Sequence, residues 1–276
     1  MKAYLPPKIC WLPGGYGCAL TVPIDALGAT LQRGEGRIAL SWRVWRQGQM
    51  VHERIDDLNF ERGYLAGATP GPFVWPPSSD WDQDGGYLEF AAETRDHTPD
   101  FVGTEVPTQY AGYFAPGRKS FFTCVQYKFG EPRVIAQIAE FGHYLDGYPV
   151  VHIDRTKGLG ESVAFVNPYK MAILAEIRTN DGRTLPRTRI PAQSAKRLAL
   201  EALLAPNESA WSGSIQITGT NRVIAYTVKH DFDDPSNLTK AEHMDPFRAD
   251  PTHVSAFRAF RVKFGHWAKD VRARLP

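Results

Sequence analysis

The most regular pattern in the chain is the alternation of apolar and polar residues in the sequence SIQIT at residues 214–218. Successive side chains of a strand point to opposite faces, so this pattern predicts a strand with one buried face. Residues 219–221 (GTN) then supply a short turn, and residues 222–229 return with apolar side chains on both faces. We therefore predict a β-hairpin whose second strand is central in its sheet.

The same alternation recurs along most of the chain. It predicts further strands at residues 19–24, 37–46, 50–55, 86–95, 119–129, 133–141, 150–154, 161–166, 171–179 and 184–190. Tight turns separate two pairs of these strands, at residues 47–49 (QGQ) and at residues 180–183 (NDGR), which contain the Asp-Gly pair typical of hairpins. Residues 194–204 (SAKRLALEALL) lack Gly, Pro and β-branched residues, so they predict one short helix with Ser194 as its N-cap.

Two halves of the sequence follow the same plan. Each has a strand, a tight turn, a strand, a connection, a Trp (Trp81 or Trp211) and a further strand, although residue identity between the halves is negligible. We therefore predict an all-β fold of two antiparallel β-sandwich units, of the immunoglobulin or jelly-roll kind, at residues 1–130 and 131–247. One large sandwich built from both halves is the alternative.

Residues 248–276 form a basic C-terminal arm, with seven Lys or Arg against two Asp. Apolar residues recur in it at steps of three and four, a helical stripe: Phe257, Phe260, Phe264, Trp267 and Val271. Alternation up to Phe264 also fits a strand, and we favour an extended arm to that residue with helical turns after it. These apolar side chains require burial against the body or against another chain, so the arm is the predicted oligomer contact.

Composition limits the class of protein. The residues are 43% hydrophobic, 12% aromatic and 22% charged, as in globular proteins, and Gly (24) and Pro (21) are spread as expected for short strands joined by turns. A net charge of +2 gives no indication of a polyanionic partner, so no nucleic-acid partner is predicted. No signal-peptide core or membrane-spanning stretch is present, so we expect a cytoplasmic protein without a membrane span, with a mature secreted form as the alternative. Three cysteines without metal-ligand spacing are expected to be reduced.

Two groups of residues are candidate metal sites. His230, Asp233, Glu242 and His243 offer imidazoles and carboxylates for a transition metal or an acid–base pair, in a spacing that fits no named motif. The alternative is a turn with local hydrogen bonds. A second group at residues 80–84 (DWDQD), with Asp80, Asp82 and Asp84 before a Gly, begins like a calcium loop but lacks the Glu at its twelfth position. A solvated acidic turn is the alternative there.

Four aromatic residues in and beside a Pro-rich loop, Phe73, Trp75, Trp81 and Tyr87, form a candidate platform for a sugar ring or a partner protein. Aromatics interleaved with Pro also pack down to fix a long loop. No catalytic motif is present. The sequence therefore favours a non-catalytic binding or assembly protein. Its partner is another protein or a second copy of the chain, and self-association would use the C-terminal arm. The alternative is a metal-dependent enzyme that uses His230 and His243.

Overall fold

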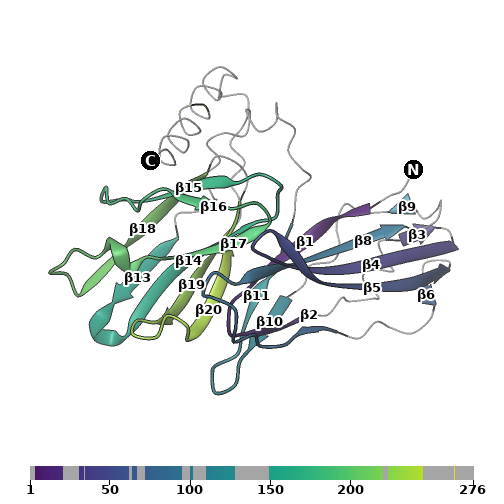
Figure 1. The fold of residues 1–276 in the computed structure, drawn as a ribbon, viewed down its shortest axis with the longest axis horizontal. Coiled ribbons are helices and arrows are strands. Elements are labelled where there is room, and N and C mark those ends of the chain that lie inside the picture. The colour runs from purple at the N-terminus through teal and green to yellow at the C-terminus, as the bar shows by residue number, and fades with distance from the viewer. Residues whose placement is uncertain are drawn as a thin grey trace. The chain divides into compact units, whose positions relative to one another are not determined.

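A computed structural model describes residues 4–20, 31–33, 35–61, 64–66, 72–94, 100–101, 110–127, 149–219, 223–244 and 264. Strands dominate these ranges, as predicted (Figure 1). Helical structure within them is confined to two 3-10 helices, η1 (Arg155–Lys157) and η2 (Glu201–Leu203), and to Phe264. None of the described helices is long and apolar enough to cross a membrane.

The chain divides into two compact units, residues 1–130 with 239–242 and residues 131–238 with 243–276. The first unit has two main antiparallel sheets. One has the order β12-β1-β8-β4-β5-β6, with strands Gln126–Tyr127, Tyr4–Leu12, Gly86–Thr94, Glu35–Arg46, Gln49–Glu61 and Tyr64–Ala66. The other has the order β11-β10-β2-β7, with strands Phe121–Cys124, Tyr110–Phe114, Gly17–Leu20 and Phe73–Trp75. A two-stranded sheet pairs β3 (Leu31–Arg33) with β9 (Asp100–Phe101).

Large aromatic side chains join the two main sheets of the first unit. Trp42 of β4 stacks on Phe73 of β7 with ring centroids 5.3 Å apart. The Tyr113 hydroxyl of β10 donates a buried hydrogen bond of 2.5 Å to the Trp11 carbonyl of β1. Because each sheet has an apolar face, the two layers bury these faces against each other, as in a β-sandwich.

The second unit contains strands β13 to β20. They are Val150–Asp154, Leu159–Asn167, Ile173–Thr179, Thr188–Ile190, Ser194–Ala199, Ala210–Gly219, Ile224–Asp231 and Leu238–Met244. The pairing gives the orders β16-β15-β18-β13 and β17-β14-β19-β20, which are linked by the single pair Asp154–Leu159 in the β13–β14 connection. Inward side chains of these strands meet in one buried cluster that includes Val151, Phe165, Ile177 and Ile215.

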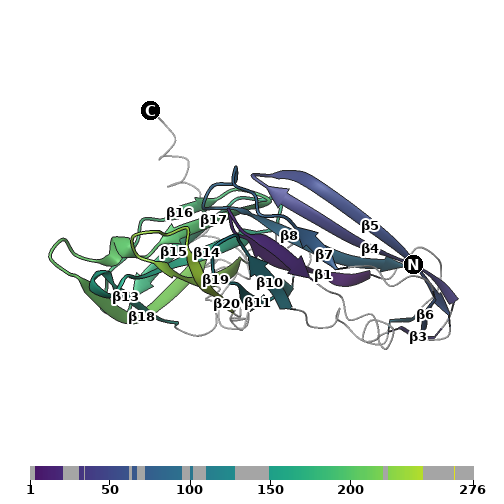
Figure 2. The same cartoon turned by 90° about the horizontal axis from the view of Figure 1, so that it is seen from below.

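The strand orders of the two units are the same. In the first unit β5-β4-β8-β1 lies in one sheet and β7-β2-β10-β11 in the other. In chain order these eight strands correspond one by one to β13–β20, so β1 matches β13, β2 matches β14 and β11 matches β20. The order β1-β8-β4-β5 can be followed in both views (Figures 1 and 2). The repeated plan of the sequence therefore corresponds to a repeated topology of eight strands.

The predicted hairpin after Trp211 is wrong in its pairing and right in its strands. β18 and β19 form where expected, and β19 is central, between β14 and β20. β18 does not pair with β19, however. Its first half, residues 210–214, pairs with β13 and its second half, residues 215–219, pairs with β15. A short connection between two alternating strands is compatible with a hairpin and equally with two strands that pair elsewhere. The packing of the whole unit determines which of these pairings forms.

The predicted helix at residues 194–204 is also wrong. Residues 194–199 form β17, which pairs with β14 along six positions from Ser194–Asn167 to Ala199–Ser162. Ser194 caps no helix, and its hydroxyl donates to the Pro191 carbonyl at 2.8 Å. Isolated helices of this length are marginal in water, so pairing with β14 overrides the local helix preference.

Both predicted tight-turn hairpins are confirmed. β4 and β5 pair around Gln47 and Gly48, which both have positive φ angles. β15 and β16 pair around the turn at residues 180–183, where Gly182 has a φ of 90°. The strand predicted at residues 133–141 lies outside the described residues. The same holds for the basic arm at residues 248–276, apart from Phe264.

Removal of the Tyr113 hydroxyl should weaken the first unit. We expect Tyr113→Phe to lose about 1–2 kcal/mol of unfolding free energy, because it removes a buried hydrogen bond between layers. Tyr110→Phe is the matched control, since Tyr110 lies on the same strand and is exposed. Urea denaturation measures both values, and equal effects of the two substitutions would contradict the bridging role of Tyr113.

Candidate functional sites

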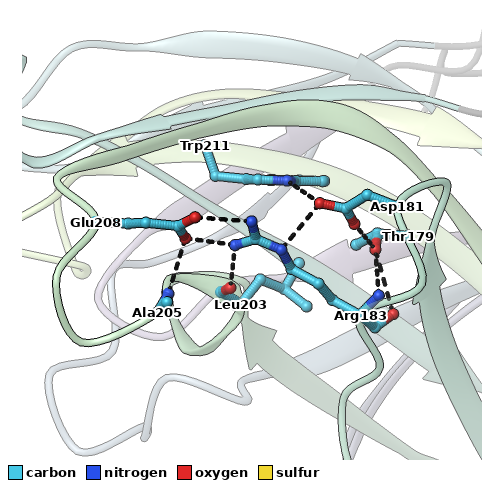
Figure 3. A network of polar contacts seen from close by, with 7 residues as sticks. All are labelled: Thr179, Asp181, Arg183, Leu203, Ala205, Glu208 and Trp211. Carbon is cyan, nitrogen blue, oxygen red and sulfur yellow. Dashed lines mark hydrogen bonds and ion pairs between the residues drawn. The ribbon is translucent and has the colours of Figure 1, made fainter.

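A dense network of polar contacts in the second unit surrounds Arg183, just after the β15–β16 turn (Figure 3). Its guanidinium binds both oxygens of Glu208, with Nη1 2.5 Å from Oε2 and Nη2 2.8 Å from Oε1. Nη1 also donates to the Leu203 carbonyl at 2.8 Å, and Nε donates to Asp181 Oδ2 at 2.9 Å. Glu208 in turn accepts from the Ala205 amide at 2.9 Å. The network therefore ties the hairpin turn to the loop that follows η2.

Trp211 completes this network from β18. Its indole Nε1 donates to Asp181 Oδ2 at 3.0 Å, and the Arg183 guanidinium lies 5.8 Å from its ring centroid. The hydrogen bond from the Thr179 hydroxyl is the main cause that lowers the pKa of Asp181 to about 2, followed by the Trp211 bond and the charge of Arg183. Because these groups form their hydrogen bonds and ion pairs with one another, the network stabilises the β15–β16 turn.

The first unit has a corresponding arrangement. Arg46, the last residue of β4, has its guanidinium 5.2 Å from the ring centroid of Trp81, which precedes β8. A Cβ on Gly86 of β8 would lie 2.7 Å from the Trp81 ring, and a Cβ on Gly213 of β18 would lie 2.6 Å from the Trp211 ring. In both units, therefore, a Trp packs on a Gly of the third strand of the repeated plan, beneath an Arg of the hairpin. We call this the Arg–Trp–Gly clamp. The recurring Trp was visible in the sequence, whereas its Arg and Gly partners were not.

His230, at the end of β19, is buried beside a carboxylate that the sequence did not indicate. Its Nε2 lies 3.2 Å from Oε1 of Glu201 in η2, and its Nδ1 lies 2.8 Å from the Asp231 carbonyl. A Cβ on Gly160 would lie 2.5 Å from the imidazole Cε1, so only Gly leaves room for the ring. Burial lowers the pKa of His230 below its ordinary value of 6.5.

Two buried or half-buried carboxylates near His230 are held by backbone amides. Glu201 Oε1 accepts from the Glu161 amide at 3.0 Å. Glu161 Oε1 accepts from the His152 amide at 3.0 Å and lies 3.3 Å from Lys229 Nζ. The His230 imidazole and the Glu201 carboxylate are therefore adjacent, and a backbone group holds each of them.

The other residues of the predicted transition-metal site have different surroundings. Asp233 lies in the exposed turn after β19, where its amide donates to Asp231 Oδ1 at 2.9 Å. Glu242 is exposed on β20 and pairs with Lys240, while the neighbouring His243 is half-buried. Within the described ranges, no three His, Cys, Asp or Glu side chains are grouped so that they could hold a metal ion.

The acidic residues of the predicted calcium loop take part in local contacts. The Asp80 carboxylate accepts from the Ser78 hydroxyl at 2.9 Å, and the Asp80 carbonyl accepts from Arg46 at 3.0 Å. Asp82 accepts from the Gly85 amide at 3.2 Å and from the Gln47 side chain at 3.3 Å. The carbonyl of Asp84 accepts from the Trp11 indole at 3.0 Å. These bonds fasten the loop to the β4–β5 turn.

The predicted aromatic platform is only partly accessible. Phe73 and Tyr87 are buried, Phe73 against Trp42 and Tyr87 against Trp45. Trp75 and Trp81 are half-buried, with their ring centroids 5.4 Å apart. The accessible part of the platform is therefore limited to these two indoles.

An exposed apolar surface that the sequence did not indicate lies on the outward face of the sheet β7-β2-β10-β11. Val74, Tyr110 and Phe122 are 54%, 63% and 71% exposed. The strand register places four residues in one row across the sheet: Phe122, Gly112, Ala19 and Val74. Tyr110 and Cys124 form the next pair on the same side of β10 and β11. We call these six residues the outer face of the first unit. None of them carries a charge.

No protein-family model and no curated protein matches the chain. Among solved structures, a biofilm-associated protein BSP domain is similar at 9% identity and a TM-score of 0.24. The match covers 89% of this chain and 58% of the length of that domain's chain. A glycosyl hydrolase family 2 member from Bacteroides cellulosilyticus is similar at 11% identity and a TM-score of 0.13, over 85% of this chain and 28% of that chain. Likenesses at these TM-scores support neither a common fold nor a common function.

The stability supplied by Asp181 should depend on acidity. Its folded pKa of about 2 lies below the ordinary 3.8, so its contribution is complete above 3.8 and is lost as the pH falls towards 2. We expect Asp181→Asn to be less stable than the wild type at neutral pH, with a difference that shrinks as the pH falls. Urea midpoints measured from neutral pH down to about 2 test this. A constant difference across that range would show that the carboxylate charge is not the cause.

Proposed function

We propose that this protein is a non-catalytic binding or assembly protein. The observation that supports the proposal is the outer face of the first unit, where Val74, Tyr110 and Phe122 are exposed on one side of a sheet. Scattered exposed apolar residues are ordinary, but apolar residues gathered on one uncharged face are typical of interaction surfaces. Aromatic residues in particular contribute much of the binding energy at protein interfaces.

The partner is a protein or a second copy of this chain. A sheet face offers no enclosed cavity of the kind that holds small molecules, whereas it suits another extended surface. The arm at residues 248–276 stays a second proposed contact for self-association, and Phe264 within it is 54% exposed. The alternative of a metal-dependent enzyme gains no specific support, because the contacts of His230 run to Glu201 and Asp231 and not to Asp233.

If the outer face serves binding, its aromatic residues should contribute little to folding. We expect Phe122→Ser to change the unfolding free energy by no more than about 0.5 kcal/mol, because Phe122 is exposed. Phe121→Ser is the matched control: the neighbouring ring is buried, and its loss should cost about 3–5 kcal/mol. Urea denaturation of the full chain compares them. A large loss in Phe122→Ser would assign that ring to the core and remove the basis of the proposal.

Metal content separates the proposed function from the enzyme alternative. We expect elemental analysis of the purified full chain to find no stoichiometric transition metal. A stoichiometric metal that is lost in the His230→Ala/His243→Ala double variant and kept in His152→Ala would overturn the non-catalytic proposal. His152 is a suitable control because its side chain is 42% exposed on β13, within the same unit.

A further inference from the structure

We propose that Cys10 and Cys18 form a disulfide that braces the two layers of the first unit when the chain meets a disulfide oxidant. This inference goes beyond the proposed function, because it concerns a covalent modification inside the sandwich and not a partner. Cys10 lies on β1 and Cys18 on β2, two strands that follow one another in the chain and belong to different sheets. Both are free cysteines and almost completely buried, at 1% and 0% exposure.

The strand register directs Cys10 into the space between the layers. Cys10 pairs with Leu88 of β8, and Leu88 pairs with Val44 of β4, so the three side chains share one face of their sheet. Trp42, two positions before Val44, lies on that face as well and stacks on Phe73 of the other sheet. The face that carries Cys10 is therefore the inward one.

The register of the second sheet directs Cys18 into the same space. Phe73 of β7 pairs with Leu20 of β2, so Leu20 shares the inward face with Phe73. Cys18 precedes Leu20 by two positions and points to the same side, because successive side chains of a strand alternate between its faces. Two thiols from opposite layers therefore enter one buried core.

Direct contacts join the two cysteine segments. Tyr113 lies opposite Cys18 in the register, and its hydroxyl donates to the carbonyl of Trp11, the residue after Cys10. The two thiols also form a side-chain hydrogen bond with each other. Because the sulfurs already contact each other across the layers, a disulfide requires only that they approach to about 2 Å, with the strand pairing unchanged.

The reaction is a thiol–disulfide exchange with a small-molecule disulfide such as oxidised glutathione. The thiolate of one cysteine attacks the oxidant, forms a mixed disulfide and releases one reduced thiol. The thiolate of the second cysteine then attacks the sulfur of the first and releases the other reduced thiol. The two cysteine protons go to the released thiols, and two electrons pass from the cysteines to the oxidant.

The rate of this exchange depends on whether the core is open. The hydrogen bond from Cys10 and the burial of the site raise the pKa of the Cys18 thiol, so its thiolate is scarce in the folded chain. We therefore expect the disulfide to form during folding and only slowly in the folded protein. Cys124 takes no part in it, because it follows the 71% exposed Phe122 by two positions and lies on the outward side of β11.

The test is refolding of the full chain in oxidised glutathione, followed by alkylation of the remaining thiols in denaturant and peptide mapping by mass spectrometry. We expect a Cys10–Cys18 disulfide, with Cys124 alkylated or bound to glutathione. The urea midpoint of the oxidised chain should lie about 1 M above that of the reduced chain, because the cross-link restricts the unfolded state. Dithiothreitol should abolish this shift.

Two variants serve as matched controls. Cys124→Ser should keep both the disulfide and the shift of the urea midpoint. Cys18→Ala should unfold at the same urea concentration under oxidising and reducing conditions. The peptide map of the wild-type chain decides the question even if Cys18→Ala fails to fold.

Several results would overturn the inference. They are alkylation of both Cys10 and Cys18 after refolding, a protein disulfide that involves Cys124, and glutathione retained on Cys10 or Cys18. A Cys10–Cys18 disulfide that leaves the urea midpoint unchanged would also overturn it, because the layers would then not be braced. The proposed function is tested separately, since neither Cys10 nor Cys18 belongs to the outer face.

Discussion

Each unit of this protein depends on the burial of one apolar face by another. A strand with alternating side chains has one apolar face, and exposure of that face to water is unfavourable. Two sheets remove their apolar faces from water by packing face to face. Trp42 on Phe73 and the bond from Tyr113 to Trp11 join the layers of the first unit. In the second unit, side chains of both layers, among them Val151, Ile177 and Phe165, meet in one buried cluster.

The repeated strand order comes with a repeated way of holding the hairpin. Arg46 lies over Trp81, which packs on Gly86, and the equivalent clamp in the second unit has Arg183 over Trp211. The Trp ring requires a strand without a side chain beneath it, so the Gly is fixed by sterics and not by turn geometry. The second unit adds the bidentate Arg183–Glu208 pair, which also anchors the loop after η2. These polar residues are as closely grouped as those of a binding site, but they form their hydrogen bonds and ion pairs with one another.

Sequence patterns indicated the candidate functional residues only in part. His230 was visible in the sequence, but its neighbour Glu201 lies 29 positions earlier in a segment predicted as helix, so no spacing rule connects them. The outer face was equally hidden, because Val74, Tyr110 and Phe122 belong to three separate strands whose register brings them together. The solvent exposure of these side chains, on which the proposed binding role depends, is a property of the packed sheet and not of any strand alone.

The sequence by itself determined the all-β class, most strand positions, the hairpin turns at Gly48 and Gly182 and the recurrence of a Trp at or shortly before the third strand of each plan. Those features depend on local chemistry: the period of two, the positive φ of Gly and the ring size of Trp. Tertiary structure decided which strands pair, so β18 and β19 are not neighbours in the strand order and residues 194–199 became β17. The reason is physical, because hydrogen bonding between strands and burial of their faces are shared among distant segments, and no local pattern specifies which segments share them.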